Sequence, residues 1–194
     1  YLDILKWGKD DKDLLNEAIE NLNLEVKNIE RIINTLFLNS NLEKITIKKE
    51  ITDVKQLFEK IKKDYELLNI KNEIIIKVDN EISIFVDKNL ISEVLRGLID
   101  NCIKYSIGNI ELLAKEDEIV EIIVRNYGEG IPEEEKKNLF NRNFQGKNAK
   151  KGSGLGLPII KDIILLNDGK IYIENRKDGI DVKIQFKKID YKNE

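Results

Sequence analysis

Histidine is absent from this chain of 194 residues. Imidazole is the side chain that titrates nearest neutral pH, and it is the commonest metal ligand in proteins. Its absence excludes a Ser-His-Asp triad, a zinc site that uses histidine and an imidazole general base. Any chemistry performed by this chain must use carboxylates, amides, lysines, backbone dipoles or a bound cofactor.

Other scarcities narrow the class of protein. A single cysteine, Cys102, excludes an internal disulfide and indicates a reducing compartment, so we expect a cytoplasmic location. Apolar runs are short, whereas a bilayer span needs about 20 residues, so we expect no membrane segment in this stretch. A membrane anchor in a longer parent protein stays open. The net charge of −3 supplies no basic field, so no nucleic-acid partner is expected.

A heptad pattern marks residues 1–44. Its apolar positions recur at alternating spacings of four and three residues, and they are Leu15, Ile19, Leu22, Val26, Ile29, Ile33 and Leu36. This spacing predicts a helix that packs in a coiled coil or bundle, and we expect a homodimer through it. The alternative is a lone amphipathic helix that covers its own domain.

Residues 45–194 alternate short strand patterns with helical ones. Strands are predicted over 45–49, 74–78, 82–86, 109–115, 119–125, 170–174 and 181–186, with 109–115 and 119–125 paired as a hairpin. Helices are predicted over 54–68, after Asp87 as N-cap, and from Pro158. The pattern predicts an α+β protein, a mixed sheet covered by helices on one face in a two-layer α/β sandwich.

A glycine-rich loop runs directly into the helix predicted from Pro158. The segment Gly152-Ser153-Gly154-Leu155-Gly156-Leu157 permits sharp turns and close approach of backbone to a ligand. The unpaired N–H groups and dipole of the following helix favour a phosphate there, and Lys147, Lys150 and Lys151 lie just upstream. No Lys-Ser/Thr pair follows the last glycine, so this is no Walker loop. An ordinary glycine turn before a helix is the alternative.

Three ordered segments resemble the motifs of histidine kinases. Residues 91–106, with Asp100-Asn101, resemble the N box, and residues 124–132 and 152–157 resemble the two glycine boxes. Phe140 and Phe144 fall at the place of the family's aromatic box. The resemblance implies the Bergerat-type ATP-binding fold that this family shares with gyrase, the Hsp90 chaperones and MutL.

The resemblance also implies a division of the chain. Residues 1–44 resemble part of the dimerisation hairpin, a helical hairpin remnant that lacks the phosphoacceptor histidine. Residues 45–194 resemble the ATP-binding catalytic domain. The implied cofactors are ATP and Mg²⁺, and the implied partner is a response regulator.

The resemblance also implies roles for the residues at positions that match the family's motifs. Asn101 is the implied Mg²⁺ ligand and, with Lys104, the implied catalytic pair, since a hard cation prefers oxygen ligands. The resemblance places the base near Tyr105, Asn126 and the loop after it. The implied nucleotide-binding set is completed by Gly128, Gly130, Ile131, Lys147, Lys151, Gly152, Ser153, Gly154, Leu155, Gly156 and Leu157. Cys102 stands where the family usually has a small residue, and we expect it to be packed and inert.

The sequence departs from the family at four points. Asn126 replaces an aspartate that accepts a hydrogen bond from the adenine amine, and Gly97 replaces a common asparagine. Gln145 lies near the place of a frequent arginine, and the phosphoacceptor histidine is missing. Two explanations of the missing histidine stay open: a chain cut after it, which a start in mid-helix favours, or a natural form that lost it.

Three functions compete. The first is an ATP-dependent histidine protein kinase module of a two-component system, whose phosphoryl group passes to a response-regulator aspartate. The alternative is a nucleotide-binding pseudokinase or scaffold, which Asn126, Gly97 and Gln145 favour. A serine kinase of the anti-sigma type shares the nucleotide fold, but the heptad helix counts against it.

Overall fold

The computed structural model describes residues 15, 46–68, 70–78, 81–141, 144 and 156–190. By its internal contacts the chain divides into two units, Tyr1–Thr46 and Ile47–Glu194. The predicted hairpin remnant falls in the first unit, and all of its heptad positions except Leu15 lie outside the described residues. The fold described below is that of the second unit.

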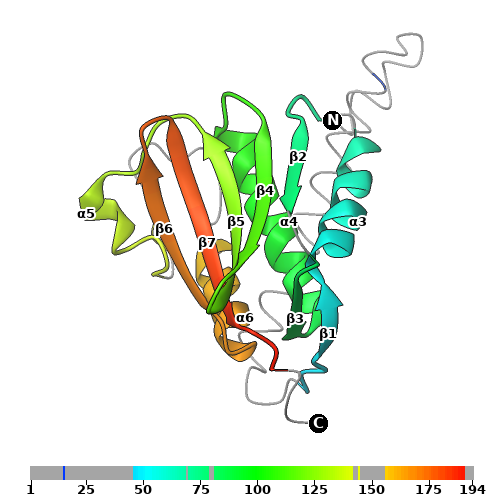
Figure 1. The fold of residues 1–194 in the computed structure, drawn as a ribbon. Coiled ribbons are helices and arrows are strands. Elements are labelled where there is room, and N and C mark those ends of the chain that lie inside the picture. The colour runs from blue at the N-terminus through cyan, green and yellow to red at the C-terminus, as the bar shows by residue number, and fades with distance from the viewer. Residues whose placement is uncertain are drawn as a thin grey trace. The chain divides into compact units, whose positions relative to one another are not determined.

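The second unit contains a five-stranded sheet in the order β2-β4-β5-β7-β6. Its strands are β2 (Ile74–Val78), β4 (Ile110–Glu116), β5 (Ile119–Tyr127), β6 (Lys170–Arg176) and β7 (Gly179–Lys187). β2 runs parallel to β4, and the other neighbouring pairs are antiparallel. The predicted hairpin is therefore confirmed as β4–β5, and the sheet is mixed (Figure 1).

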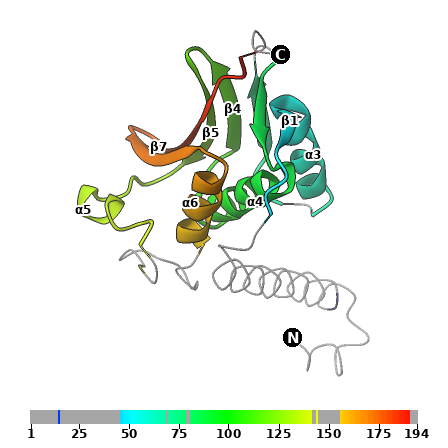
Figure 2. The same ribbon diagram turned by 90° about the horizontal axis from the view of Figure 1, so that it is seen from below.

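Helices cover one face of this sheet (Figure 2). They are α3 (Val54–Glu66), α4 (Lys88–Tyr105) and α6 (Gly156–Leu166), while the short α5 (Glu133–Lys136) lies beyond the edge strand β6 (Figure 1). The two-layer α+β sandwich predicted from the sequence is thus confirmed. No helix among the described residues is long and apolar enough to cross a membrane.

The long helix α4 begins where the sequence indicated. Asp87 has extended backbone angles, and its carboxylate accepts from the backbone N–H groups of Asn89 and Leu90, both at 3.1 Å. A side-chain oxygen at this position satisfies N–H groups that have no partner within the helix. The buried face of α4 supplies much of the core, with Ile91, Val94, Leu95, Leu98 and Ile99.

Helices α4 and α6 run antiparallel. The backbone N–H of Asp87, at the start of α4, donates to Oδ1 of Asn167, just after the end of α6, over 2.7 Å. Midway along, Gly97 of α4 lies against the side chain of Ile160 of α6. The last turn of α4 and the first turn of α6 therefore lie at the same end of the helical layer.

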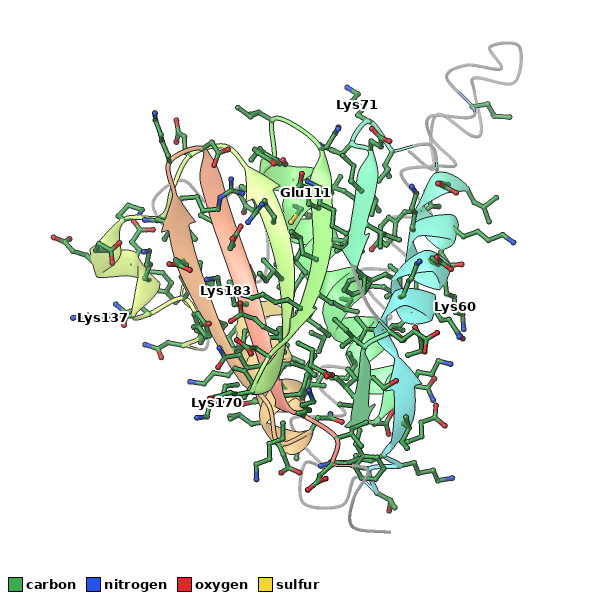
Figure 3. The ribbon with its side chains drawn as sticks, in the orientation of Figure 1. Lys60, Lys71, Glu111, Lys137, Lys170 and Lys183 are labelled. Atoms are coloured by element: carbon green, nitrogen blue, oxygen red, sulfur yellow. The ribbon has the colours of Figure 1, made fainter. Side chains whose placement is uncertain are left out.

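The opposite face of the sheet is mostly polar. Glu111 of β4 pairs with Lys77 Nζ at 2.7 Å and with Arg125 Nη1 at 3.3 Å. Arg125 also binds Asp181 through two hydrogen bonds of 2.8 and 3.0 Å. Figure 3 shows Glu111 and Lys183 on this face. Such a face needs no covering layer, which fits the two-layer architecture.

One predicted strand is wrong. Residues 46–49 form no strand, and β1 (Glu50–Asp53) instead pairs antiparallel with β3 (Ser83–Val86) in a separate two-stranded sheet. The alternation over 45–49 predicted the strand too early, because the partner strand β3 ends at Val86, opposite Glu50, and the chain then enters α4. The backbone N–H of Lys48 donates to Oδ2 of Asp87 over 3.0 Å, and the ammonium of Lys49 pairs with Asp168.

Candidate nucleotide-binding site

The last turn of α4 carries the residues expected from the N box. Asn101 is partly buried, Lys104 is exposed, and the Tyr105 side chain is 40% exposed. Tyr105 is therefore not a core residue. The spacing of three and four residues from Asn101 places Lys104 and Tyr105 one helical turn further along.

The loop after β5 lies beside that turn. Gly128 has φ +151°, and a Cβ there would come 3.3 Å from the carbonyl oxygen of Tyr105. Only glycine adopts this backbone without strain, so the close approach of loop and helix end depends on it. Ser106 stabilises this contact. Its hydroxyl donates to the carbonyl oxygen of Tyr127 over 3.1 Å and accepts from the backbone N–H of Tyr127 over 3.3 Å.

Asn126 lies near the end of β5, on the face that the helices cover. Its side chain is buried, with a relative exposure of 7%, and Oδ1 has no hydrogen-bond partner. Leaving a buried acceptor unpaired costs roughly 1–3 kcal/mol, so a ligand or water that supplies a donor is favoured there. This is the position at which the resemblance implied contact with the base.

The β6–β7 hairpin anchors the glycine loop. The backbone N–H of Gly128 donates to the carbonyl of Asp178 over 3.0 Å. The side chain of Asn175 accepts from the N–H of Ile131 over 2.9 Å and donates to its carbonyl over 2.8 Å. Sequence reasoning missed Asn175, because it lies 44 residues from Ile131 and belongs to none of the three motifs.

Helix α6 begins at Gly156, two residues earlier than predicted, so that Pro158 falls in its first turn. Gly156 is exposed, Leu157 is partly buried, and Pro158 is buried. The antiparallel packing brings this first turn to the same end as Asn101. The remaining expected phosphate-binding residues lie outside the described residues, and they are Lys147, Lys151, Gly152, Ser153, Gly154 and Leu155; Gln145 lies there too.

Two further positions carry no reactive group into the site. Gly97 is buried against Ile160, so its place in α4 serves helix packing. Cys102 is buried, and burial together with the nearby charge of Asp100 raises the pKa of its thiol to about 12. A thiol with such a pKa is protonated at neutral pH, in keeping with the inert cysteine expected from the sequence.

This chain is similar to a known protein family and to curated histidine kinases. The model of the family described as "Histidine kinase-, DNA gyrase B-, and HSP90-like ATPase" matches residues 86–190, more than half of the chain. The signal transduction histidine-protein kinase ArlS of Staphylococcus aureus is 30% identical over 206 residues. That match covers 94% of this chain but 43% of ArlS, so the chain spans less than half the length of this relative.

Solved structures agree in fold. The catalytic domain of histidine kinase ThkA matches with a TM-score of 0.64 and 28% identity, covering 73% of this chain and 96% of that domain. The histidine kinase AdeS of Acinetobacter baumannii matches with a TM-score of 0.70 and 25% identity, covering 97% of this chain and 92% of that one. ThkA has also been crystallised in complex with the response regulator protein TrrA, a structure 24% identical over 97% of this chain and 55% of that one, with a TM-score of 0.70.

Proposed function

This chain belongs to the histidine kinase-, DNA gyrase B- and HSP90-like ATPase family and carries the catalytic domain of a sensor histidine kinase, and from this premise we propose its reaction. It binds ATP with Mg²⁺ and donates the γ-phosphate to a histidine that lies outside these 194 residues. The phosphoryl group then passes to an aspartate of a response regulator. The protein's part in such a transfer is positioning and charge stabilisation.

The observation that carries the proposal is the buried, unpaired Oδ1 of Asn126. An adenine amine supplies the donor that this atom lacks. The neighbouring Gly128 removes the side chain that would separate the loop from the end of α4, and the exposed ring of Tyr105 lies at the same turn. These three residues fit a flat base with a hydrogen-bonding edge.

Mg²⁺ fits the residues present, because it usually keeps several waters and needs few protein ligands beside the phosphates of its nucleotide. Among the described residues no group of three or more His, Cys, Asp or Glu side chains gathers to hold a metal. The amide oxygen of Asn101 would hold the ion, whose charge offsets that of the phosphates. Tyr65 of α3 supports this turn of α4, since its hydroxyl donates to Oδ1 of Asp100 over 2.6 Å.

We assign phosphate binding to the first turn of α6. Its N–H groups at Gly156 and Leu157 begin the helix, and the positive end of the helix dipole favours an anion there. Lys104, on the neighbouring turn of α4, adds a positive charge at this end. Lys147 and Lys151 remain predicted phosphate contacts from the sequence.

The acceptor and the assembly are further parts of the proposal. A histidine must come from another segment or polypeptide, because the 194 residues contain none. The crystallised pair of ThkA and TrrA supports a response regulator as partner. We place the reaction in the cytoplasm, in agreement with the single free cysteine. The heptad residues from Leu15 to Leu36 would form the dimer, and light scattering over a range of concentrations tests that assembly.

A second function is nucleotide binding without transfer. It is favoured by Gly97, which packs against Ile160 and offers the site no polar group. An amide at Asn126 is also a weaker acceptor than a carboxylate. A protein of this second kind would bind nucleotide without transferring a phosphoryl group. A binding measurement alone therefore does not distinguish it from a kinase.

Titration calorimetry with ADP and with ATP, each with and without Mg²⁺, tests the shared premise. We expect binding that Mg²⁺ strengthens. No heat and no thermal shift at millimolar nucleotide would overturn both functions. Acid-labile phosphate on an added histidine-bearing hairpin then separates the kinase from the binding protein.

A further inference from the structure

Asn126 of β5, Ile180 of β7 and Asn175 of β6 form one row across the sheet, near the end of β5 that leads into the glycine loop. Asn126 pairs in register with Ile180, and Ile180 pairs in register with Asn175. Directly paired residues on neighbouring strands point to the same face, so both asparagines face the helical layer. Figure 1 shows β5, β7 and β6 side by side, with α5 beyond β6.

The two asparagines of this row differ in their partners. Oδ1 of Asn126 is buried without a partner. Asn175 instead uses both ends of its amide on one residue, accepting from the N–H of Ile131 at 2.9 Å and donating to its carbonyl at 2.8 Å. A side-chain amide carries an acceptor and a donor close together. It can therefore bond to both the N–H and the C=O of one residue, as the backbone of a neighbouring strand does.

The contact leaves little freedom to the loop. A Cβ at Gly130 would come 3.2 Å from Oδ1 of Asn175, so the loop backbone rests directly on this side chain. Nδ2 also lies 3.4 Å from Oε1 of Glu133, at the start of α5. With Gly128 bound to the carbonyl of Asp178 at 3.0 Å, the loop is held at both ends by the β6–β7 hairpin.

We propose that Asn175 is a positioning residue that sets the Ile131 wall of the base pocket and thereby the affinity for the base. The inference rests on the proposed function, and within it on the assignment of Ile131 to the nucleotide-binding set that the family resemblance implies. By fixing the backbone of Ile131 before nucleotide arrives, Asn175 removes an ordering cost from binding. Ligands that carry a purine benefit, while a bare polyphosphate does not reach this wall.

The test compares Asn175→Ala with Asn89→Ala, an exposed asparagine in the first turn of α4. Calorimetry measures the affinity for Mg²⁺ with ADP and, separately, for Mg²⁺ with inorganic tripolyphosphate. We expect Asn175→Ala to weaken ADP binding roughly five- to thirtyfold, the effect of one or two hydrogen bonds, and to leave tripolyphosphate binding unchanged. Asn175→Asp puts a carboxylate oxygen next to the Ile131 carbonyl and Oε1 of Glu133, so it should weaken ADP binding at least as much as alanine does.

Hydrogen exchange in the nucleotide-free protein measures the contact itself. The amide of Ile131 should be protected in the parent and in Asn89→Ala, and exposed in Asn175→Ala. Equal losses for ADP and tripolyphosphate, or unchanged ADP affinity in Asn175→Ala, would overturn the positioning role while leaving the proposed function intact. A parent protein that binds no ADP would overturn the proposed function, and the role of Asn175 in base binding with it.

Discussion

Gly97 of α4 lies against Ile160 of α6, so closely that a Cβ on the glycine would come 3.2 Å from Cδ1 of the isoleucine. Histidine kinases commonly have an asparagine at the position of Gly97. The departure therefore changes how the two helices that flank the candidate site pack, as well as the polarity of the candidate site. Any restoration of the family residue has to make room between α4 and α6.

We accordingly predict that Gly97→Asn lowers the free energy of unfolding by about 1–3 kcal/mol, the usual cost of overpacking a core. Ile160→Val removes the closest methyl group and should reduce that cost when the two changes are combined. Urea denaturation of the parent, both single variants and the double variant measures the coupling. Strictly additive effects would show that the contact between these residues is not the cause.

Asn101 gives the second prediction. Because its amide oxygen would hold Mg²⁺, Asn101→Ala should weaken nucleotide binding in the presence of Mg²⁺ and leave the Mg²⁺-independent part unchanged. Loss of a ligand of this kind is expected to cost about 1–3 kcal/mol of binding free energy. Calorimetry with ADP in Mg²⁺ and in EDTA measures both parts. An equal loss in the two conditions would assign Asn101 to packing instead of metal binding.

Asn126 gives the third prediction. Asn126→Leu keeps the approximate volume but removes the acceptor, so it should weaken ADP binding roughly five- to thirtyfold. Asn126→Asp supplies a stronger, charged acceptor and should keep or improve the affinity. In the absence of nucleotide the same carboxylate is buried, so this variant should also unfold more easily. A leucine variant that binds ADP as well as the parent would show that Asn126 does not read the base.

Much of this fold could be predicted from local sequence. The capping aspartate Asp87, the helical spacing of α3 and the β4–β5 hairpin all have short-range signals, and each is confirmed. Long-range contacts have no such signal. Neither the strand order nor the end of β3 opposite Glu50, which leaves the residues before Glu50 without a strand partner, follows from local alternation.

The site divides in the same way. Asn101, Asn126 and the glycine boxes are predicted from motif spacing, since these residues lie in continuous segments. Motif spacing cannot predict Asn175. The role proposed for it depends on a hydrogen-bonded contact between β6 and a loop distant in sequence. The packing of Gly97 against Ile160 likewise cannot be predicted from local sequence, because it depends on the contact between α4 and α6.

The outer face of the sheet gives a prediction on pH. Burial alone would raise the pKa of Glu121, but hydrogen bonds from Gln185, Tyr172 and Lys115 outweigh it and lower the pKa from 4.5 to about 2. A carboxylate with a depressed pKa stabilises the folded state above its unfolded pKa, and this stabilisation is lost as the pH falls from about 4.5 toward about 2. Glu121→Gln should therefore flatten the acid dependence of unfolding in that window.

Acid titration followed by circular dichroism measures this effect. Glu121→Gln should also cost on the order of 1–3 kcal/mol at neutral pH, because the ion pair with Lys115 is lost. The exposed Glu118→Gln, on the turn between β4 and β5, is the matched control and should behave as the parent. Identical acid transitions for Glu121→Gln and the parent would contradict the assigned environment of Glu121.

The last prediction concerns phosphoryl transfer. Incubation of this chain alone with labelled ATP should leave no acid-labile phosphate on it, because phosphohistidine cannot form on a chain without histidine. The groups proposed to hold ATP, which are Asn101, Lys104 and the first turn of α6, do not depend on that histidine. A separate dimerisation hairpin that bears the histidine should therefore become labelled in trans, and Asn101→Ala should abolish the label. If the hairpin stays unlabelled while calorimetry shows bound ATP, the kinase function is contradicted and nucleotide binding without transfer is supported.

The variant Asn126→Asp in the same assay tests whether the amide of Asn126 is the cause of a missing label, since a carboxylate there restores the stronger acceptor for the base. Label on the hairpin with this variant alone would assign the loss of transfer to Asn126.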